Sequence, residues 1–234
     1  MIDGKRILAV VPARGGSKGV TLKNLRPVLG IPIVARVGDC IRDVHYIDRA
    51  VVSTDHEEIA KVAAAAGIAA PFRRPADLSG DHVADWPVLQ HALIETERVD
   101  GTIYDIILML QPTAPLRTAA QVQRAIEYFV TGGYDAVWTV TETDLKYHPL
   151  KQFTMRNGLL DYFDKDGKTI VARQQLSPVY HVNGVAYVFS RDCILEQKSK
   201  LGRKTGGLIL DGPDVSIDTL ADFDTVERHL NAQT

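Results

Sequence analysis

The sequence predicts an α/β fold with a mostly parallel sheet, helices on both faces and a small β-rich insertion. Residues 7–11 form a continuous apolar run, typical of a strand buried on both faces, and a glycine-rich loop follows at once. Apolar runs then alternate with amphipathic segments, which is the β-α order of a parallel sheet. The alternation breaks near Asn157-Gly158, a strong hairpin signal between two short runs.

The first half of the chain reads as a strand, a loop, a helix and a second strand. Residues 33–44 carry apolar residues at helical spacing, and residues 49–53 (RAVVS) predict a strand. Asp55 is expected to cap a helix over residues 57–66, which ends at Gly67. Residues 68–72 are then expected to form a further strand.

The second half continues this alternation on both sides of the insertion. We expect helices over residues 86–98, 119–130 and 219–230, and strands over residues 105–110, 135–140, 184–189, 208–210 and 215–217. The α/β domain therefore covers residues 1–147 and 184–234, and the β-rich insertion covers residues 148–183.

Composition limits the class of protein. The chain has 234 residues, 45% hydrophobic and 24% charged, and a net charge of −2, so non-specific nucleic-acid binding is not expected. The apolar run near the N-terminus is too short for a signal sequence or a membrane span. Cys40 and Cys193 have no metal-ligand spacing, which indicates reduced thiols and a cytoplasmic location.

The loop after the first strand is the best candidate for an anion site. Arg14, Lys18, Lys23 and Arg26 are interleaved with glycines at the carboxyl end of that strand, where open α/β sheets bind ligands. Glycines let backbone amides approach a polyphosphate, and the cations neutralise its charge. The alternative is a surface loop with solvated lysines. The order of residues fits neither a P-loop nor G-x-G-x-x-G, which leaves nucleotidyl transfer.

An acidic cluster near the C-terminus could bind Mg²⁺, because carboxylate oxygens suit this ion. It consists of Asp211, Asp214, Asp218, Asp222 and Asp224. Asp222 and Asp224 lie early in the expected helix and are better explained as capping or solvated residues. Asp218 is the candidate metal ligand. The turn of residues 111–117 (QPTAPLR) has either a functional role or a purely structural one, with Thr118 as the helix cap.

Seven ordered motifs across nearly the whole chain resemble the acylneuraminate cytidylyltransferase family. They are VPARGGSKGVTLKN (11–24), VVSTD (51–55), RRPADLSGD (73–81), LQPTAPLR (110–117), HPLK (148–151), ARQQLSPVYHVNGVAY (172–187) and SIDT (216–219). The resemblance implies a Rossmann-like fold similar to the nucleotide-diphospho-sugar transferases. It also implies transfer of CMP from CTP to a nine-carbon 2-keto-3-deoxy sugar acid, with Mg²⁺ as the cofactor and pyrophosphate as the second product.

The resemblance also implies roles for individual residues. The catalytic set would be Arg14, Lys23 and Asp218, with Asp218 binding the metal. The nucleotide-binding set would be Ala13, Arg14, Gly15, Gly16, Ser17, Lys18, Lys23, Asn24, Arg74 and Gln111. The substrate-binding set would be Gln111, Lys151, Arg173, Gln174, Asn183 and Tyr187. No residue identifies itself as the general base.

Two positions depart from the family pattern. Ser216 stands where an acidic residue is usual, so a single carboxylate is expected to bind the metal. Thr21 stands where the loop usually has proline, which should loosen it. The family further implies a homodimer formed through the insertion. A related nucleotidyltransferase with another acceptor, such as a KDO-type sugar, and a non-catalytic CTP-binding protein stay as alternatives.

Overall fold

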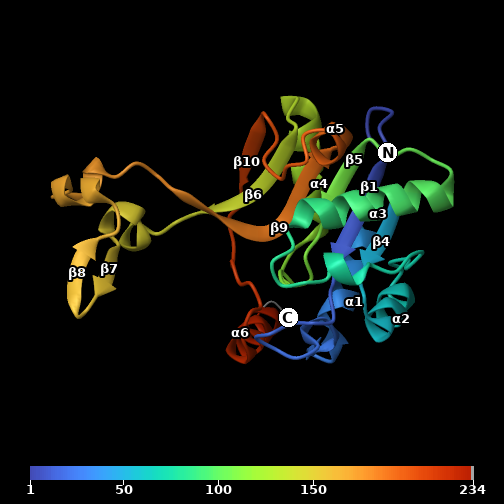
Figure 1. Cartoon of the computed structure of the whole chain (residues 1–234), viewed down its shortest axis with the longest axis horizontal. Helices are drawn as coiled ribbons and strands as arrows, with labels where there is room; N and C mark the ends of the chain where they lie inside the picture. Colours follow the sequence, from blue (N-terminus) through green and yellow to red (C-terminus); the bar gives the residue numbers. More distant parts are fainter. Residues whose placement is uncertain (233–234) are drawn as a thin grey trace.

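A six-stranded sheet forms the centre of the computed structural model, which describes residues 1–232 (Figure 1). Its strand order is β10-β6-β9-β5-β1-β4. The strands are β1 (Ile7–Pro12), β4 (Arg49–Ser53), β5 (Ile106–Met109), β6 (Ala136–Glu142), β9 (Tyr180–Ser190) and β10 (Thr205–Ile209). Only β9 runs against its neighbours β5 and β6, so the expected mostly parallel sheet is confirmed.

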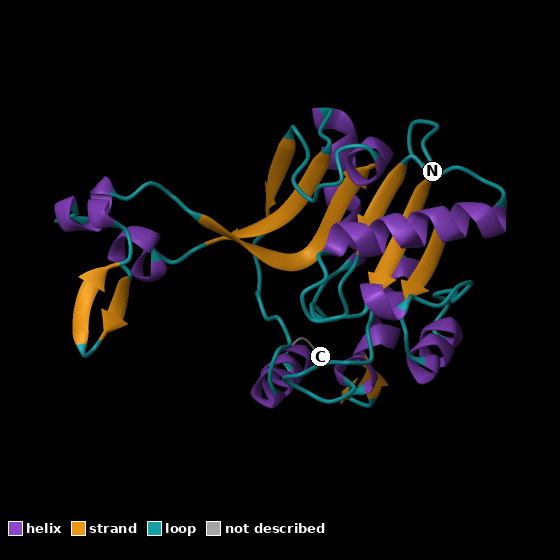
Figure 2. Ribbon diagram, viewed as in Figure 1, coloured by secondary structure: helices purple, strands orange, loops and turns teal. Residues whose placement is uncertain are grey.

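Helices cover both faces of the sheet, as expected (Figure 2). The helices are α1 (Ile33–Arg42), α2 (Glu57–Ala65), α3 (Asp85–Asp100), α4 (Ala119–Gly132), α5 (Arg191–Leu195) and α6 (Leu220–Asn231). Alternate residues of β1 enter two separate apolar cores: Ala9 packs in the core shared with α1, α2 and α4, and Val10 in the core shared with α3 and α5. This alternation explains why β1 is apolar throughout.

A third apolar cluster joins the two ends of the chain. Val20 of the glycine-rich loop and Val28 of the small β2–β3 ladder (Pro27–Val28, Ile31–Pro32) pack with Ile217 and Phe223. Ile217 is fully buried there, and its amide donates to the carbonyl of Thr113 at 2.8 Å. The segment that precedes α6 is therefore held against the loop that follows β1.

Several local expectations are confirmed by the backbone. Thr118 caps α4, and Gln121 completes a capping box. Gly67 follows α2 with φ of 84°, and Gly133 ends α4 with φ of 57°, both in the left-handed region that glycine tolerates. Free thiols are found at both Cys40 and Cys193.

Three local expectations are wrong. Asp55 does not cap α2, because His56 holds the N-cap position, without a side-chain hydrogen bond. The Asp55 carboxylate instead accepts a hydrogen bond from the amide of Gly15 at 2.8 Å. Residues 68–72 form only one bridge, from Ala69 to Val51. Residues 215–217 are not a strand, because the apolar cluster and Thr113 hold them instead of a sheet neighbour.

The inserted region forms an arm that projects from the body of the molecule (Figures 1 and 2). It contains the expected hairpin, β7 (Phe153–Arg156) paired with β8 (Leu159–Tyr162), and short 3₁₀ turns. Asn157 and Gly158 both have positive φ, 52° and 78°, as a type I′ turn requires. Strand β9 starts at Tyr180, on the arm side of the body, and returns the chain to the central sheet.

Candidate nucleotide site

A cavity of about 300 Å³ opens at the carboxyl ends of β1 and β5. The chain passes from β1 to β4 on one side and then to β5 on the other, which makes this edge the topological switch point of the sheet. The cavity is lined by Pro12, Arg14, Ser17, Lys23, Asn24, Arg74, Leu78, Gly80, Asp81, Val83, Asp85, Val88, Leu89, Met109, Gln111, Pro112 and Thr113. The lining thus combines three cations, Arg14, Lys23 and Arg74, with apolar side chains.

The glycine-rich loop is held by contacts within it and by contacts to the rest of the protein. The buried Asn24 side chain donates to the carbonyl of Arg14 at 3.0 Å and closes residues 14–24 into one turn. A Cβ at Gly19 would lie 2.7 Å from the carbonyl oxygen of Asp218, so only glycine permits this close approach. Ala13 is buried and its amide donates to Ser53 at 2.9 Å. These contacts fix where the loop cations project.

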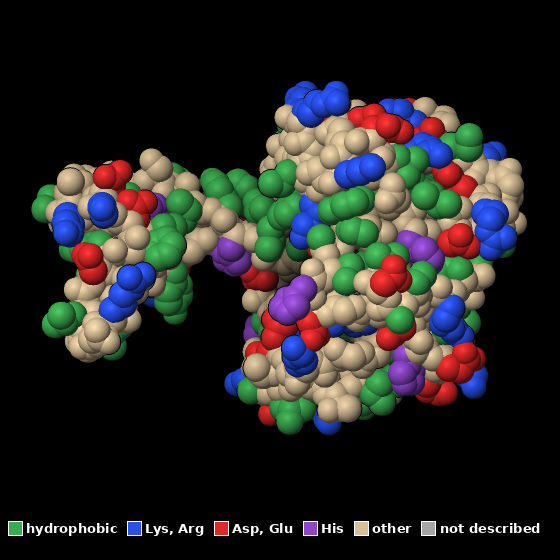
Figure 3. Space-filling view, viewed as in Figure 1, with side chains coloured by type: hydrophobic (Ala, Val, Ile, Leu, Met, Phe, Trp, Pro, Cys, Tyr) green, Lys and Arg blue, Asp and Glu red, His purple; other side chains and the backbone are tan. Residues whose placement is uncertain are grey.

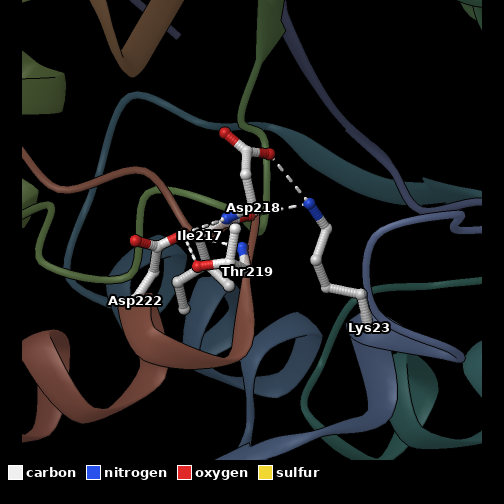
Figure 4. Close-up of polar contacts among 5 residues, drawn as sticks. All are labelled: Lys23, Ile217, Asp218, Thr219 and Asp222. Carbon is white, nitrogen blue, oxygen red and sulfur yellow. Dashed lines mark hydrogen bonds and ion pairs between the residues drawn. The ribbon is translucent and has the colours of Figure 1, made fainter.

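Lys23 joins the loop to the segment before α6 (Figure 4). Its Nζ donates to the carbonyl of Ile217 at 2.7 Å and lies 3.1 Å from Oδ1 of Asp218. The Lys23 side chain is 14% exposed, whereas that of Asp218 is 73% exposed. The structure therefore brings together two predicted catalytic residues that are 195 positions apart.

Asp222 supports Asp218 through the backbone. Its carboxylate accepts the amides of Asp218 at 2.8 Å and of Thr219 at 2.6 Å, as Figure 4 shows. These hydrogen bonds lower the pKa of Asp222, because they stabilise its ionised form. Asp222 thus caps α6, as its position in the sequence suggests, and fixes the turn that presents Asp218.

Arg14 and Lys18 share one acidic partner. Arg14 Nη1 and Lys18 Nζ each lie 2.6 Å from the Asp81 carboxylate, one on each oxygen. Hydrogen bonds from Lys18 and then Arg14 lower the pKa of Asp81. Asp81 is a site residue that sequence reasoning missed: the motif RRPADLSGD contains it, but nothing in the spacing shows that it folds back onto the loop.

Arg74 is the most buried of the cavity cations. It is 6% exposed, its Nε donates to the Ser53 hydroxyl at 3.0 Å, and its guanidinium also donates to the Ser53 carbonyl. Burial lowers the pKa of Arg74 to about 10, so the side chain stays a cation at neutral pH. Gln111 lines the same cavity from the end of β5. Of the other expected nucleotide contacts, Ser17 lines the cavity, while Gly16 has open space beside its Cα.

The expected sugar-binding residues are divided between two places. Lys151 and Arg173 line surface hollows on the arm, and Gln174 is exposed there. Asn183 is buried in β9, where Thr139 donates to it at 2.7 Å and it donates to Thr141 at 3.1 Å. Tyr187 is buried edge-on to Trp138. Within one chain, none of these five side chains lines the cavity that holds Gln111, and their roles stay predictions.

The donor set near Asp218 limits what metal it can hold. Among residues 1–232 no group of three or more His, Cys, Asp or Glu side chains is placed to bind an ion. Asp222 is occupied by amides, and Asp214 by His181 at 2.6 Å. The exposed Asp218 carboxylate offers a single oxygen-donor group, which fits Mg²⁺ shared with substrate phosphates and waters rather than an all-protein cage.

A basic glycine loop at the switch point of a doubly wound sheet, next to a buried arginine, defines a phosphate-binding α/β protein. A comparison with protein families matches residues 8–205 to the family described as cytidylyltransferase. The chain belongs to this cytidylyltransferase family and is a nucleotidyltransferase, as its motifs indicated.

Curated relatives match along most of their length. The flagellin modification protein B of Campylobacter coli is 32% identical over 94% of this chain and 93% of the relative. The CMP-N,N'-diacetyllegionaminic acid synthase of Legionella pneumophila is 30% identical over 95% of each. The pseudaminic acid cytidylyltransferase of Campylobacter jejuni is 32% identical over 81% of each.

Solved structures support the fold. A CMP:2-keto-3-deoxy-manno-octonic acid synthetase complexed with CTP superposes with a TM-score of 0.71 at 18% identity, over 98% of this chain and all of the other. This likeness confirms the α/β fold that the sequence predicts. Within residues 1–232, no helix has the length and apolar character needed to cross a bilayer.

Proposed function

We propose that this protein transfers CMP from CTP to the anomeric hydroxyl of a sialic-acid-like nonulosonic acid and releases pyrophosphate. The observation that carries this proposal is that Arg14, Lys23 and Arg74 line one cavity at the switch point, with Asp218 beside Lys23 and with Lys18 on the cavity-lining residue Asp81. The similarity to the legionaminic acid synthase and the pseudaminic acid cytidylyltransferase supports cytidine as the nucleotide and a nine-carbon sugar acid as the acceptor.

The position of each cation suggests its role in the transfer. Lys23 stands next to Asp218, so it would neutralise charge that develops on the α-phosphate during attack by the sugar hydroxyl. Arg14 and Lys18 lie earlier in the loop, on Asp81, and would hold the leaving pyrophosphate. Arg74 and Gln111 line the same cavity, where apolar side chains such as Leu89 and Met109 would contact the base.

Asp218 would hold Mg²⁺ together with phosphate oxygens of CTP. The ion would act as a Lewis acid on the α-phosphate. The protein's own contribution is positioning: Ile217 and Asp222 fix the backbone of Asp218, and Lys23 orients one of its oxygens. Ser216 offers no second carboxylate next to Asp218, in keeping with a single protein carboxylate on the metal.

We propose a homodimer that forms through the arm. Phe153, Leu159 and Val171 are 52%, 76% and 90% exposed, and Figure 3 shows apolar side chains gathered on the projecting arm and at its junction with the body. Burial of this surface against a second copy would stabilise both chains. It would also bring Lys151 and Arg173 of one chain near the cavity of the other, where two cations suit a sugar carboxylate.

We further propose a cytoplasmic location. Both cysteines are free thiols: Cys193 is buried and Cys40 partly buried, and they lie in different cores of the molecule. Free thiols are typical of proteins that work in a reducing compartment.

The proposal is tested by measuring pyrophosphate release with each nucleoside triphosphate against a panel of sugar acids, in Mg²⁺. We expect release with CTP and one nine-carbon acid, such as N-acetylneuraminic, legionaminic or pseudaminic acid. Release with a KDO-type acid alone would reassign the acceptor. CTP binding without release for any acceptor would show a non-catalytic nucleotide-binding protein.

A further inference from the structure

Asp81 places both of its carboxylate oxygens on the cations expected to bind phosphate. Oδ1 lies 2.6 Å from Arg14 and Oδ2 lies 2.6 Å from Lys18. Carboxylate and phosphate oxygens bind arginine and lysine in the same way, by charge-assisted hydrogen bonds. We propose that Asp81 stands in for the nucleotide's phosphates in the free protein and is displaced by them. This inference rests on the proposed function of the same site.

The segment that carries Asp81 is built so that it can move. Residues 75–84 are mostly exposed, and their backbone bonds are local, such as Leu78 to Pro75 at 3.1 Å and Val83 to Gly80 at 3.5 Å. Among the hydrogen bonds and ion pairs of residues 1–232, the contacts of Asp81 are the ones that join this segment to the glycine-rich loop.

Both ends of the segment are anchored. On one side Arg74 is fixed by Ser53, and on the other Asp85 pairs with Lys200 at 2.8 Å. Between these anchors, Leu78 and Val83 line the cavity next to Asp81. Release of Asp81 would therefore free one wall of the cavity without unfolding α3. The segment acts as a latch that is closed by two partly exposed ion pairs.

The relative charges of the Asp81 carboxylate and of the phosphates determine which of them binds Arg14 and Lys18. Asp81 carries one negative charge, whereas the triphosphate of CTP carries several and would also accept hydrogen bonds from loop amides. CTP would therefore displace Asp81 from Arg14 and Lys18. After the bond to CMP is broken, pyrophosphate no longer benefits from the contacts that the CMP part of CTP would make with the cavity. Return of Asp81 to Arg14 and Lys18 would then favour its departure. Breaking the two Asp81 ion pairs costs the same free energy for either ligand, so Asp81 weakens the binding of both CTP and pyrophosphate, and for pyrophosphate this favours release.

The test compares binding of pyrophosphate and of CTP by calorimetry to wild type, Asp81→Asn and Asp77→Asn. Asp77 lies on the same segment but does not contact the loop cations, so its variant removes an equal charge as a matched control. Partly exposed ion pairs contribute little each, and loss of two competing pairs should tighten pyrophosphate binding by roughly 2- to 30-fold. Asp77→Asn should bind within about 2-fold of wild type.

Hydrogen exchange gives a second readout on folded protein. Pyrophosphate should raise amide exchange of residues 75–84 in wild type, and Asp81→Asn should show that raised exchange without ligand. Unchanged or weaker pyrophosphate binding by Asp81→Asn, while wild type still binds CTP, would overturn the latch and leave the proposed function intact. Failure of wild type to bind CTP would overturn both.

Discussion

Replacement of Lys23 by methionine removes one charge and keeps the aliphatic stem. The ammonium group donates to the carbonyl of Ile217 at 2.7 Å, a hydrogen bond from a charged donor that contributes about 1.5–3 kcal/mol to stability. Its pair with Asp218 adds at most about 1 kcal/mol, because the Asp218 side chain is 73% exposed. The melting temperature should therefore fall by about 3–16 °C, at about 2–4 °C per kcal/mol for a chain of this size.

The loss of activity should be far larger than the loss of stability explains. Removal of a preorganised charge at the developing transition state lowers kcat by about 10² or more. Pyrophosphate release at saturating CTP and sugar acid, measured well below the melting temperature of the variant, gives kcat directly. Lys61→Met is the control, since Lys61 is an exposed lysine of α2 outside the cavity lining. Turnover by Lys23→Met within about 3-fold of wild type would refute the role of Lys23 as a transition-state cation.

Three further outcomes are expected. Asp218→Asn should raise the Mg²⁺ concentration for half-maximal activity about 10-fold or more in a metal titration, whereas Asp224→Asn should not; equal shifts would remove Asp218 from its role. Asp222→Asn should lower the free energy of unfolding by about 1 kcal/mol in urea at pH 7. Because the folded-state pKa of Asp222 is lowered, its contribution is present above about pH 4 and is lost as the pH falls, so a gap that persisted unchanged in acid would contradict this reasoning. Leu159→Asp should turn a dimer into a monomer by analytical ultracentrifugation, and a monomeric wild type would refute the role of the arm.

Local pattern was enough to predict β1, inside the sheet, and β4, at its edge. β1 and β4 are apolar runs whose bounds depend on burial on both faces, and the Asn157-Gly158 turn depends only on two positive φ angles. The apolar run of residues 215–217 misled the prediction, because burial against Val20 and Phe223 produces the same pattern as burial in a sheet.

The site was predictable in its parts but not in its pairings. The loop cations and Asp218 are recognisable in the sequence by their charge and position. Their contact is visible only in the structure, where the packing of Ile217 places Asp218 beside Lys23. Asp55 and Asp81 could not be foreseen, because each carboxylate acts across a long stretch of chain on the glycine-rich loop. Both partners of each pair lie in loops, and no pattern in the sequence indicates which loop residues come together in space.

The central claim is the transfer of CMP to a sugar acid, and ³¹P NMR of one reaction mixture tests it most directly. The protein, CTP, Mg²⁺ and the best acceptor of the panel are incubated together, and all phosphorus species are followed in time. The account predicts that one CMP–sugar phosphodiester and one pyrophosphate appear for each CTP consumed. Formation of CDP and phosphate, or of free CMP and pyrophosphate with the sugar acid unchanged, would contradict it.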